Sequence, residues 1–379
     1  MRVAIVTESF LPQVNGVTNS VLRVIEHLRD AGHRVLVVAP GSGDTEYRDT
    51  RVIRLPAYEL PVVDSLPVGV PTRALTHALR RFAPDVVHLA SPFVVGAHAV
   101  RVARRAGIPS VAVYQTDVPG FAGAYGLGFA ERAAWRWMRR VHGMADRTLA
   151  PSRESVEQLR GHGIPRVHLW PRGVDAERFT PARAGTGMRA ALAARDELLV
   201  GFVGRLAPEK EVDRLAALRH VPGVRVVVVG DGPELEPLRS RLAGVTFLGP
   251  RYGEELAEVY AALDVFVHTG PHETFCQTVQ EAMASGVPVL APAAGGPKDL
   301  VRDGETGYLL PVERERFASA MCGRLGELAD PRLRAVMGAR GRRAVLARSW
   351  SAICDELLDH YSAVTGLRPT GGRPRDLVA

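Results

Sequence analysis

The most informative absence from the 379-residue sequence is lysine. Only Lys210 and Lys298 are lysine among the 48 basic residues, and the other 46 are arginine. A GC-rich genome would explain this bias without any functional cause, but it would not explain why both lysines fall in loops that are predicted to form a site. Because an ammonium and a guanidinium bind phosphate differently, Lys210 is singled out as a functional residue and Lys298 as a weaker candidate.

Other absences exclude whole classes of protein. The three cysteines form no Cys-x-x-Cys pair, so neither disulfides nor a zinc cluster are expected. No apolar run approaches the roughly 18 residues of a membrane-spanning helix. The first strand meets Glu8 too soon for the apolar core of a signal peptide. These features predict a soluble protein in a reducing compartment, the cytoplasm.

The remaining pattern is an alternation of strands and helices, which predicts a doubly wound α/β fold. The alternation restarts near residue 198, and the length favours two domains. Strands are expected at 2–7, 34–39, 51–55, 85–89, 109–114, 147–150, 166–169, 198–203, 226–229, 245–248, 264–268 and 287–290. Helices are expected at 17–30, 72–82, 129–142, 153–160, 313–327, 331–346 and 349–364, and further helices after Lys210 and after Pro233.

Residues 269–300 read as a loop, a helix, a short strand and a glycine loop. The backbone amides of Phe275, Cys276 and Gln277 would lie unpaired at the helix N-terminus, where amides and the helix dipole favour an anion. Glu273 precedes the helix and Glu281 lies within its first turns. The two acids can bracket an anion site, although an ordinary strand–helix unit with solvated glutamates remains the alternative.

Two other loops follow predicted strands and carry candidate binding residues. After strand 198–203 come Gly204, Arg205 and Lys210, and a guanidinium fork beside a point charge suits a diphosphate. Gly16 ends the loop after the first strand, where backbone amides are exposed at the sheet edge. A plain turn between strand and helix is the alternative at Gly16.

The predicted helix 129–142 interleaves Trp135 and Trp137 with four arginines. Such a helix can lie on an anionic bilayer with its tryptophans at the interface. It can equally pack its apolar side on the core and leave a solvated basic face. Both interpretations stay open at this point.

The string HETFCQTVQEAMASGVPVLAPAAGGPKDLV resembles the donor-sugar motif of the family-4 retaining glycosyltransferases. The strings Tyr-Gln-Thr-Asp, Trp-Pro-Arg-Gly-Val-Asp and Glu-Thr-Phe-Cys-Gln resemble those of its GDP-mannose-dependent α-mannosyltransferases, which act on glycolipids. The resemblance implies the GT-B fold, two Rossmann-like doubly wound domains facing a central cleft. It implies an acceptor domain at 1–177, joined by a returning C-terminal helix at 349–366, and a donor domain at 178–348. The tail 367–379 is expected to be disordered.

The resemblance also assigns roles. Glu273 would contact sugar hydroxyls, Glu281 would hold the nucleotide ribose, and Gly16 would approach the phosphates. Arg205, Lys210 and the helix amides would stabilise the charge of the departing diphosphate.

One position departs from the family pattern, because Gln115 stands where many members have a histidine, and glutamine cannot act as a base. Proton acceptance then falls either to Asp117 or to the leaving phosphate. The sequence contains no Asp-x-Asp triplet, so no bound metal is expected on the diphosphate.

The predicted function is transfer of a hexose, mannose from GDP-mannose, onto a glycolipid or other membrane-associated acceptor, with no cofactor and no nucleic acid partner. A peripheral position at the inner face of the plasma membrane fits the basic helix. The alternatives are transfer from a UDP-sugar to a soluble acceptor, and a GT-B epimerase or a hydrolase. A hydrolase would use Glu273 and Glu281 as its acid–base pair, which leaves Arg205 and Lys210 without a role.

Overall fold

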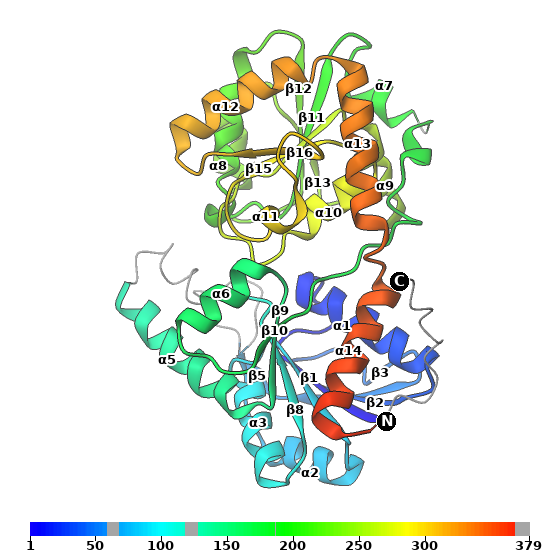
Figure 1. The fold of residues 1–379 in the computed structure, drawn as a ribbon, viewed down its shortest axis with the longest axis vertical. Helices are drawn as coiled ribbons and strands as arrows, with labels where there is room; N and C mark the ends of the chain where they lie inside the picture. Colours follow the sequence, from blue (N-terminus) through cyan, green and yellow to red (C-terminus); the bar gives the residue numbers. More distant parts are fainter. Residues whose placement is uncertain (59–67, 118–127, 186, 368–379) are drawn as a thin grey trace, which may run out of the picture. The chain divides into compact units, whose positions relative to one another are not determined.

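The computed structural model describes residues 1–58, 68–117, 128–185 and 187–367. The chain divides into two compact units, shown in Figure 1. Unit 1 comprises Met1–Arg172 and the chain from Trp350 onward, and unit 2 comprises Gly173–Ser349. The expected division was at 177/178, five residues later. Each unit is described by itself, and the predicted cleft between the two sheets stays a prediction.

Unit 1 is built on an eight-stranded sheet in the order β10-β9-β8-β7-β1-β2-β4-β3. All its neighbouring strands pair in parallel except β3 with β4. The strands are β1 (Arg2–Thr7), β2 (Arg34–Pro40), β3 (Glu46–Tyr47), β4 (Thr50–Leu55), β7 (Val86–Ala90), β8 (Ser110–Val113), β9 (Arg147–Ala150) and β10 (Val167–Leu169), and β5 (Ala57–Tyr58) pairs separately with β6 (Val68–Gly69). The parallel order around β1 is that of a doubly wound fold.

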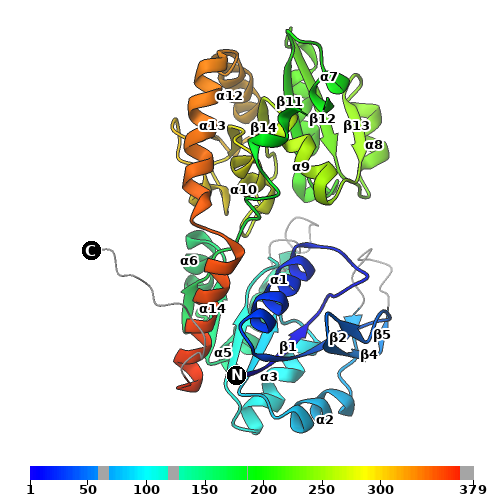
Figure 2. The same ribbon diagram turned by 90° about the vertical axis from the view of Figure 1, so that its right-hand side faces the viewer.

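Helices cover both faces of this sheet, as Figures 1 and 2 show. On one face, α1 (Gly16–Asp30) and α14 (Trp350–Thr365) pack against the odd-numbered residues of β1 and β2. On the other face lie α2 (Arg73–Phe82), α3 (Val95–Arg105) and α5 (Gly128–Met144), and α6 (Arg153–Gly161) packs beside β9 and β10. The continuous apolar strands follow from burial on both faces.

The last helix, α14, belongs to unit 1 although it follows the whole of unit 2 in sequence. Its Ile353 carbonyl accepts a hydrogen bond from the indole of Trp170 at 2.8 Å. Its Tyr361 hydroxyl lies 2.8 Å from Nδ1 of His88, and both side chains are buried. Helix α14 therefore completes the core of the first sheet.

Unit 2 is built on a six-stranded, entirely parallel sheet in the order β13-β12-β11-β14-β15-β16. The strands are β11 (Leu198–Val203), β12 (Val224–Val229), β13 (Thr246–Gly249), β14 (Val265–Val267), β15 (Val289–Pro292) and β16 (Gly307–Leu310). The helices are α7 (Met188–Leu192), α8 (Leu235–Arg241), α9 (Gly253–Ala262), α10 (Gln277–Ala284), α11 (Pro297–Leu300), α12 (Arg314–Glu327) and α13 (Pro331–Leu346), with 3₁₀ segments η1 (Pro181–Gly185), η2 (Pro208–Lys210) and η3 (Val212–His220). Two apolar clusters, one on each face, form its core.

Several elements differ from the sequence predictions; α9 and β16, for example, were not expected. Helix α3 was not expected, and its N-cap Val94 makes no side-chain cap hydrogen bond. The carboxylate of Glu8 caps it instead, accepting from the amides of Phe93, Val94 and Gly96 at 2.8–2.9 Å, so the start signal lies 85 or more residues away. Strand β15 begins two residues later than predicted, because the Val287 amide still bonds to α10 through the Ala282 carbonyl. The segment after Lys210 is 3₁₀ rather than α-helical.

Helix α5 forms as predicted, but Trp135 cannot lie at a lipid interface. Its side chain is only 8% exposed, and its ring stacks on His162 with 3.6 Å between centroids. The indole of Trp137 donates to the Phe93 carbonyl at 2.9 Å. The placement of Trp135 among the lipid headgroups was therefore wrong, because both tryptophans pack against apolar clusters of unit 1. Its arginines 132, 136, 139 and 140 are exposed.

Candidate functional site

The predicted donor residues lie in loops that leave the carboxyl ends of β11, β14 and β15, the edge where doubly wound sheets bind ligands. Hydrogen bonds tie these loops together. The Thr269 hydroxyl donates to the Lys210 carbonyl at 2.6 Å, and the Gly296 amide donates to the Glu273 carbonyl at 2.8 Å. The structure therefore brings Lys210, Glu273 and the glycine loop together within unit 2.

The two glycines of that loop allow its close approach to the helix start. Gly295 has a φ of +60°, and a Cβ there would lie 2.4 Å from the Glu273 carbonyl oxygen. A Cβ on Gly296 would lie 2.1 Å from the Phe275 carbonyl oxygen. Any larger residue would push the loop off residues 273–275, so these glycines fix the backbone that presents Glu273.

The centre of the site is a contact between Lys210 and Glu273. The Lys210 ammonium forms a short ion pair with Oε1 of Glu273, and both side chains are largely buried. Burial lowers the pKa of Lys210, but the Glu273 carboxylate outweighs it, and the net shift is upward. Lys210 therefore stays a cation, as stabilisation of an anionic leaving group requires.

His268 lies on the other side of Glu273. Its Nε2 is 3.4 Å from Glu273 Oε1, and its ring stacks on Phe202. Burial lowers the pKa of His268 to about 4, although the Glu273 carboxylate opposes this shift. The imidazole is therefore neutral near pH 7. The sequence analysis gave His268 no role, because a histidine at the end of a buried strand carries no local signal of a site.

Cys276 is the N-cap of α10 and adopts a left-handed backbone with φ of +72°, which is uncommon for a residue other than glycine. Strain of this kind is concentrated at functional sites. Among the described residues, the amides of Phe275, Cys276 and Gln277 donate to no backbone carbonyl. This arrangement suits the predicted anion site, which stays a prediction.

Glu281 lies one turn into α10 and accepts a hydrogen bond from the Tyr260 hydroxyl at 3.2 Å. Burial raises its pKa to about 7, and hydrogen bonds from Tyr260 and Gln277 partly oppose that shift. The side-chain Nε2 of Gln277 donates to the Gly173 carbonyl at 3.1 Å. Glu281 is thus a half-buried acid, and Tyr260 is a partner that the sequence analysis missed.

Arg205 and Gly204 follow β11 directly. The Arg205 side chain is exposed, and within the described part of the chain it has no hydrogen bond or ion pair. The Gly204 amide donates to the Val229 carbonyl at 3.0 Å, which links this loop to the end of β12. Arg205 is therefore free to bind an anion, whereas Lys210 is already paired.

The other two predicted site residues, Gly16 and Asp117, lie in unit 1. The Gly16 carbonyl accepts a hydrogen bond from Arg172 at 2.8 Å, and Arg172 also donates to Oε1 of Gln115 at 2.6 Å. Oδ1 of Asp117 accepts from the Tyr114 hydroxyl at 2.9 Å. Gln115, at the position of the family histidine, is therefore a partner of the buried Arg172, a residue to which the sequence analysis gave no role.

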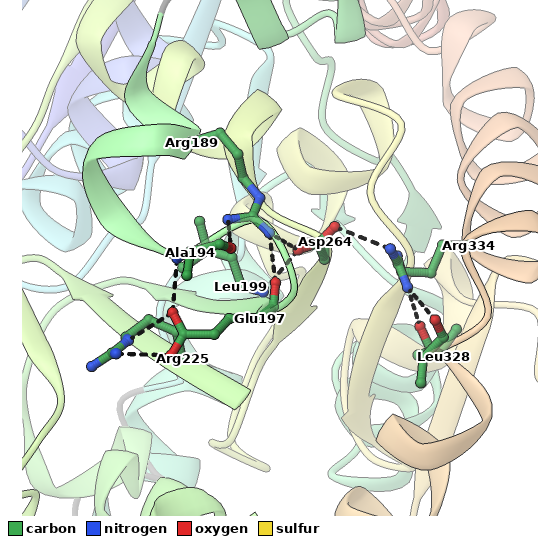
Figure 3. A network of polar contacts seen from close by, with 9 residues as sticks. Arg189, Ala194, Glu197, Leu199, Arg225, Asp264, Leu328 and Arg334 are labelled. Atoms are coloured by element: carbon green, nitrogen blue, oxygen red, sulfur yellow. Dashed lines mark hydrogen bonds and ion pairs between the residues drawn. The ribbon is translucent and has the colours of Figure 1, made fainter. Parts of the chain in front are cut away.

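The amino-terminal edge of the sheet in unit 2, opposite the donor loops, carries a different network of charged residues, drawn in Figure 3. Asp264, just before β14, accepts from the Leu199 amide at 2.8 Å and pairs with Arg189 and Arg334 at 3.1 and 3.4 Å. Arg334 also donates to the Leu328 carbonyl at 2.6 Å, as Figure 3 shows. At this edge of the sheet, Asp264 is therefore paired with two arginines and a backbone amide.

Two further findings bear on partners. Within the described ranges, one group of three metal-type ligands lies close together, namely His268, Glu273 and Cys276. None of the helices in those ranges is long and apolar enough to cross a membrane.

The two doubly wound units have the GT-B fold of glycosyltransferases. The model of Glycosyltransferase Family 4 matches residues 14–178, and that of Glycosyl transferases group 1 matches residues 197–326. Sucrose-phosphate synthase from Thermosynechococcus elongatus has the same fold, with a TM-score of 0.77, 23% sequence identity and coverage of 96% of this chain and 99% of that one. The chain belongs to glycosyltransferase family 4, and the predicted fold is confirmed.

Curated relatives narrow the comparison further. The GDP-mannose-dependent alpha-mannosyltransferase of Mycobacterium tuberculosis (strain CDC 1551 / Oshkosh) is 54% identical over 376 residues, 98% of each chain. The protein of the same name from Corynebacterium glutamicum is 47% identical over 97% of this chain and 90% of its own. The resemblance to the mannosyltransferase branch of the family is thereby confirmed.

Proposed function

We propose that the protein transfers mannose from GDP-mannose to a glycolipid or other membrane-associated acceptor, with retention of the anomeric configuration. The observation that carries this proposal is 54% identity, over 98% of both chains, to a GDP-mannose-dependent alpha-mannosyltransferase. The similarity spans both units, so it covers the candidate donor loops of unit 2 and the Gly16 and Asp117 loops of unit 1.

The site supports a role for each candidate residue. Breaking the bond from the sugar to the diphosphate leaves negative charge on the phosphate. The Lys210 ammonium, the Arg205 guanidinium and the amides of residues 275–277 supply the donors that would stabilise it. Glu273 would accept hydrogen bonds from sugar hydroxyls while Lys210 orients its carboxylate, and Glu281 would bind the ribose.

In this proposal the acceptor's proton goes either to the leaving phosphate or to Asp117. Gln115 is excluded as the base, because an amide cannot take a proton. The sequence has no Asp-x-Asp triplet, and the donor's charge is met by side chains and amides, so turnover would need no cofactor.

The decisive experiment is a donor panel with purified protein. Release of GDP from GDP-mannose only when an acceptor is present is expected, and UDP-glucose and ADP-glucose should be turned over far more slowly. Release without acceptor would indicate a hydrolase. Preference for a UDP-sugar would replace the proposed donor, and turnover of soluble acceptors alone would replace the proposed acceptor class.

The exposed arginines of α5 support a peripheral position on an anionic membrane, since each basic residue near such a surface contributes about 1 kcal/mol. Reversing Arg136, Arg139 and Arg140 to glutamate should abolish sedimentation with anionic vesicles, and salt should weaken the binding of the unaltered protein. The matched control reverses three exposed arginines of α13, namely Arg332, Arg340 and Arg343. Equal vesicle binding by both triple variants would remove α5 from the proposal.

A further inference from the structure

The inference starts from His268, whose side chain is 2% exposed at the end of β14. Neither of its ring nitrogens meets the distance and angle of a normal hydrogen bond with the described residues, although the Gly270 backbone and the Glu273 carboxylate lie close enough to raise its pKa. Leaving a buried polar atom without a partner costs about 1–3 kcal/mol. Such an atom in a folded protein therefore calls for an explanation, and a ligand for the ring nitrogen would provide one.

The two neighbours of this ring carry the other atoms of a metal site. One ring nitrogen of His268, a carboxylate oxygen of Glu273 and Sγ of Cys276 lie within 4.8 Å of one another. Two ligands of a tetrahedral zinc ion at about 2.05 Å lie about 3.3 Å apart. The distance from His268 Nε2 to Glu273 Oε1 is 3.4 Å, so this pair already has the spacing of two zinc ligands.

The mixture of donor atoms selects the kind of ion. Calcium and magnesium take oxygen ligands, whereas a thiolate, an imidazole and a carboxylate together suit zinc and similar borderline-soft divalent ions. Three protein ligands also leave one of the four positions of a tetrahedral ion open to solvent or to a bound molecule.

The ligands are held by structure that is independent of any ion. The His268 ring stacks at 13° on Phe202, which is buried. Cys276 is fixed as the left-handed N-cap of α10. The backbone of Glu273 is held by the bond from the Gly296 amide to its carbonyl. Little conformational freedom would be lost when an ion binds.

We propose that His268, Glu273 and Cys276 form an inhibitory site for a zinc-class divalent cation. The ion takes the Glu273 carboxylate as a ligand and breaks its ion pair with Lys210. The thiol proton of Cys276 leaves to solvent as the metal–sulfur bond forms. Since Glu273 and Lys210 are both donor-site residues in the proposed function, an occupied metal site and turnover exclude each other.

The first test uses Co²⁺ as a spectroscopic probe of the full-length protein and needs no turnover. A thiolate-to-cobalt charge-transfer band that saturates at one ion per chain is expected, and Zn²⁺ should displace the cobalt. Cys276→Ser should abolish the band, and His268→Gln should weaken zinc binding by at least about 10–100-fold, the loss that even outer-sphere changes cause. A thermal melt confirms that each variant is folded.

The control is Cys322→Ser, which removes a cysteine that lies outside the site. This variant should keep the band and the zinc affinity. Absence of the band from the unaltered protein, or its survival in folded Cys276→Ser, would overturn the proposed site.

The second test measures turnover of GDP-mannose against free Zn²⁺ in a metal buffer. Inhibition should follow the occupancy measured with the probe and be reversed by a chelator. Full turnover at saturating zinc would overturn the inhibitory role. A protein that binds cobalt through Cys276 but turns over no nucleotide sugar would refute the proposed function alone, so the two failures are distinguishable.

Discussion

The two edges of the sheet in unit 2 hold charged side chains in opposite states. At the amino-terminal edge, Asp264 pairs with Arg189 and Arg334 and accepts a backbone amide, so its charge is matched on several sides. At the carboxyl edge, Arg205 is exposed without a partner among the described residues, and neither ring nitrogen of His268 makes a hydrogen bond of normal geometry with them. The same sheet therefore has paired charges at one edge and, at the other, polar groups without partners of normal geometry in the described part of the chain.

The difference shows what each edge is for. A satisfied network gains nothing from a ligand and contributes only to folding. At the other edge, the exposed Arg205 remains available to an anion, and the buried ring nitrogens of His268 carry an energetic cost that a ligand would relieve. The carboxyl edge holds Lys210 beside Arg205, whereas the cations drawn in the network of Figure 3 are all arginines.

The largest effect is expected at the carboxyl edge. Lys210→Ala and Arg205→Ala should each lower kcat by about 10²-fold or more, while the affinity for GDP falls far less, because the charge that they stabilise grows in the transition state. Steady-state kinetics beside calorimetric GDP binding would measure the two quantities. Near-normal turnover in either variant would remove that residue from the mechanism.

The reverse pattern is expected at the amino-terminal edge. Asp264→Ala leaves two arginines and the Leu199 amide without their partner, and should lower the free energy of unfolding by about 2–3 kcal/mol. kcat per folded molecule should not change. Glu236→Ala removes an exposed ion pair with Arg239 and should change stability by less than about 0.5 kcal/mol. A fall in kcat for folded Asp264→Ala would show that the two edges are coupled.

A pH-dependent effect on stability is expected from Glu281, at the carboxyl edge. Burial raises the pKa of Glu281 from 4.5 to about 7, so the folded protein holds a proton that the unfolded chain has lost. The stability contributed by this group is complete below pH 4.5 and is lost as pH rises through 7, by at most about 1.4 kcal/mol per pH unit. Glu281→Gln should therefore become progressively more stable than the unaltered protein over this range. Parallel stability curves in chemical denaturation would contradict the shift.

No effect on turnover is expected when metal ions are removed. Excess EDTA should cause no loss of turnover, because side chains and backbone amides meet the charge of the diphosphate without a metal. Loss of activity that Mg²⁺ or Mn²⁺ restores would show that the carboxyl edge is incomplete without an ion.

Much of the fold could be predicted from hydrophobic runs and turns, because most strands of parallel sheets are apolar throughout. Helix α3 could not, since its cap is the distant Glu8. In the site, Lys210 and Glu273 stood out as residue types in loops after strands. The partners of site residues, Arg172, Tyr260 and His268, depend on tertiary contacts between remote segments, and nothing local marks them.

The position of α14 has a consequence for synthesis on the ribosome. The first sheet is translated by residue 169, but the apolar face that receives Ile353, Leu357 and Tyr361 stays uncovered until those residues emerge from the exit tunnel. Unit 2 is continuous in sequence and can close as soon as it is made. The nascent chain should therefore complete its second-made unit first, and a chaperone that binds exposed apolar strands would meet the first unit during that interval.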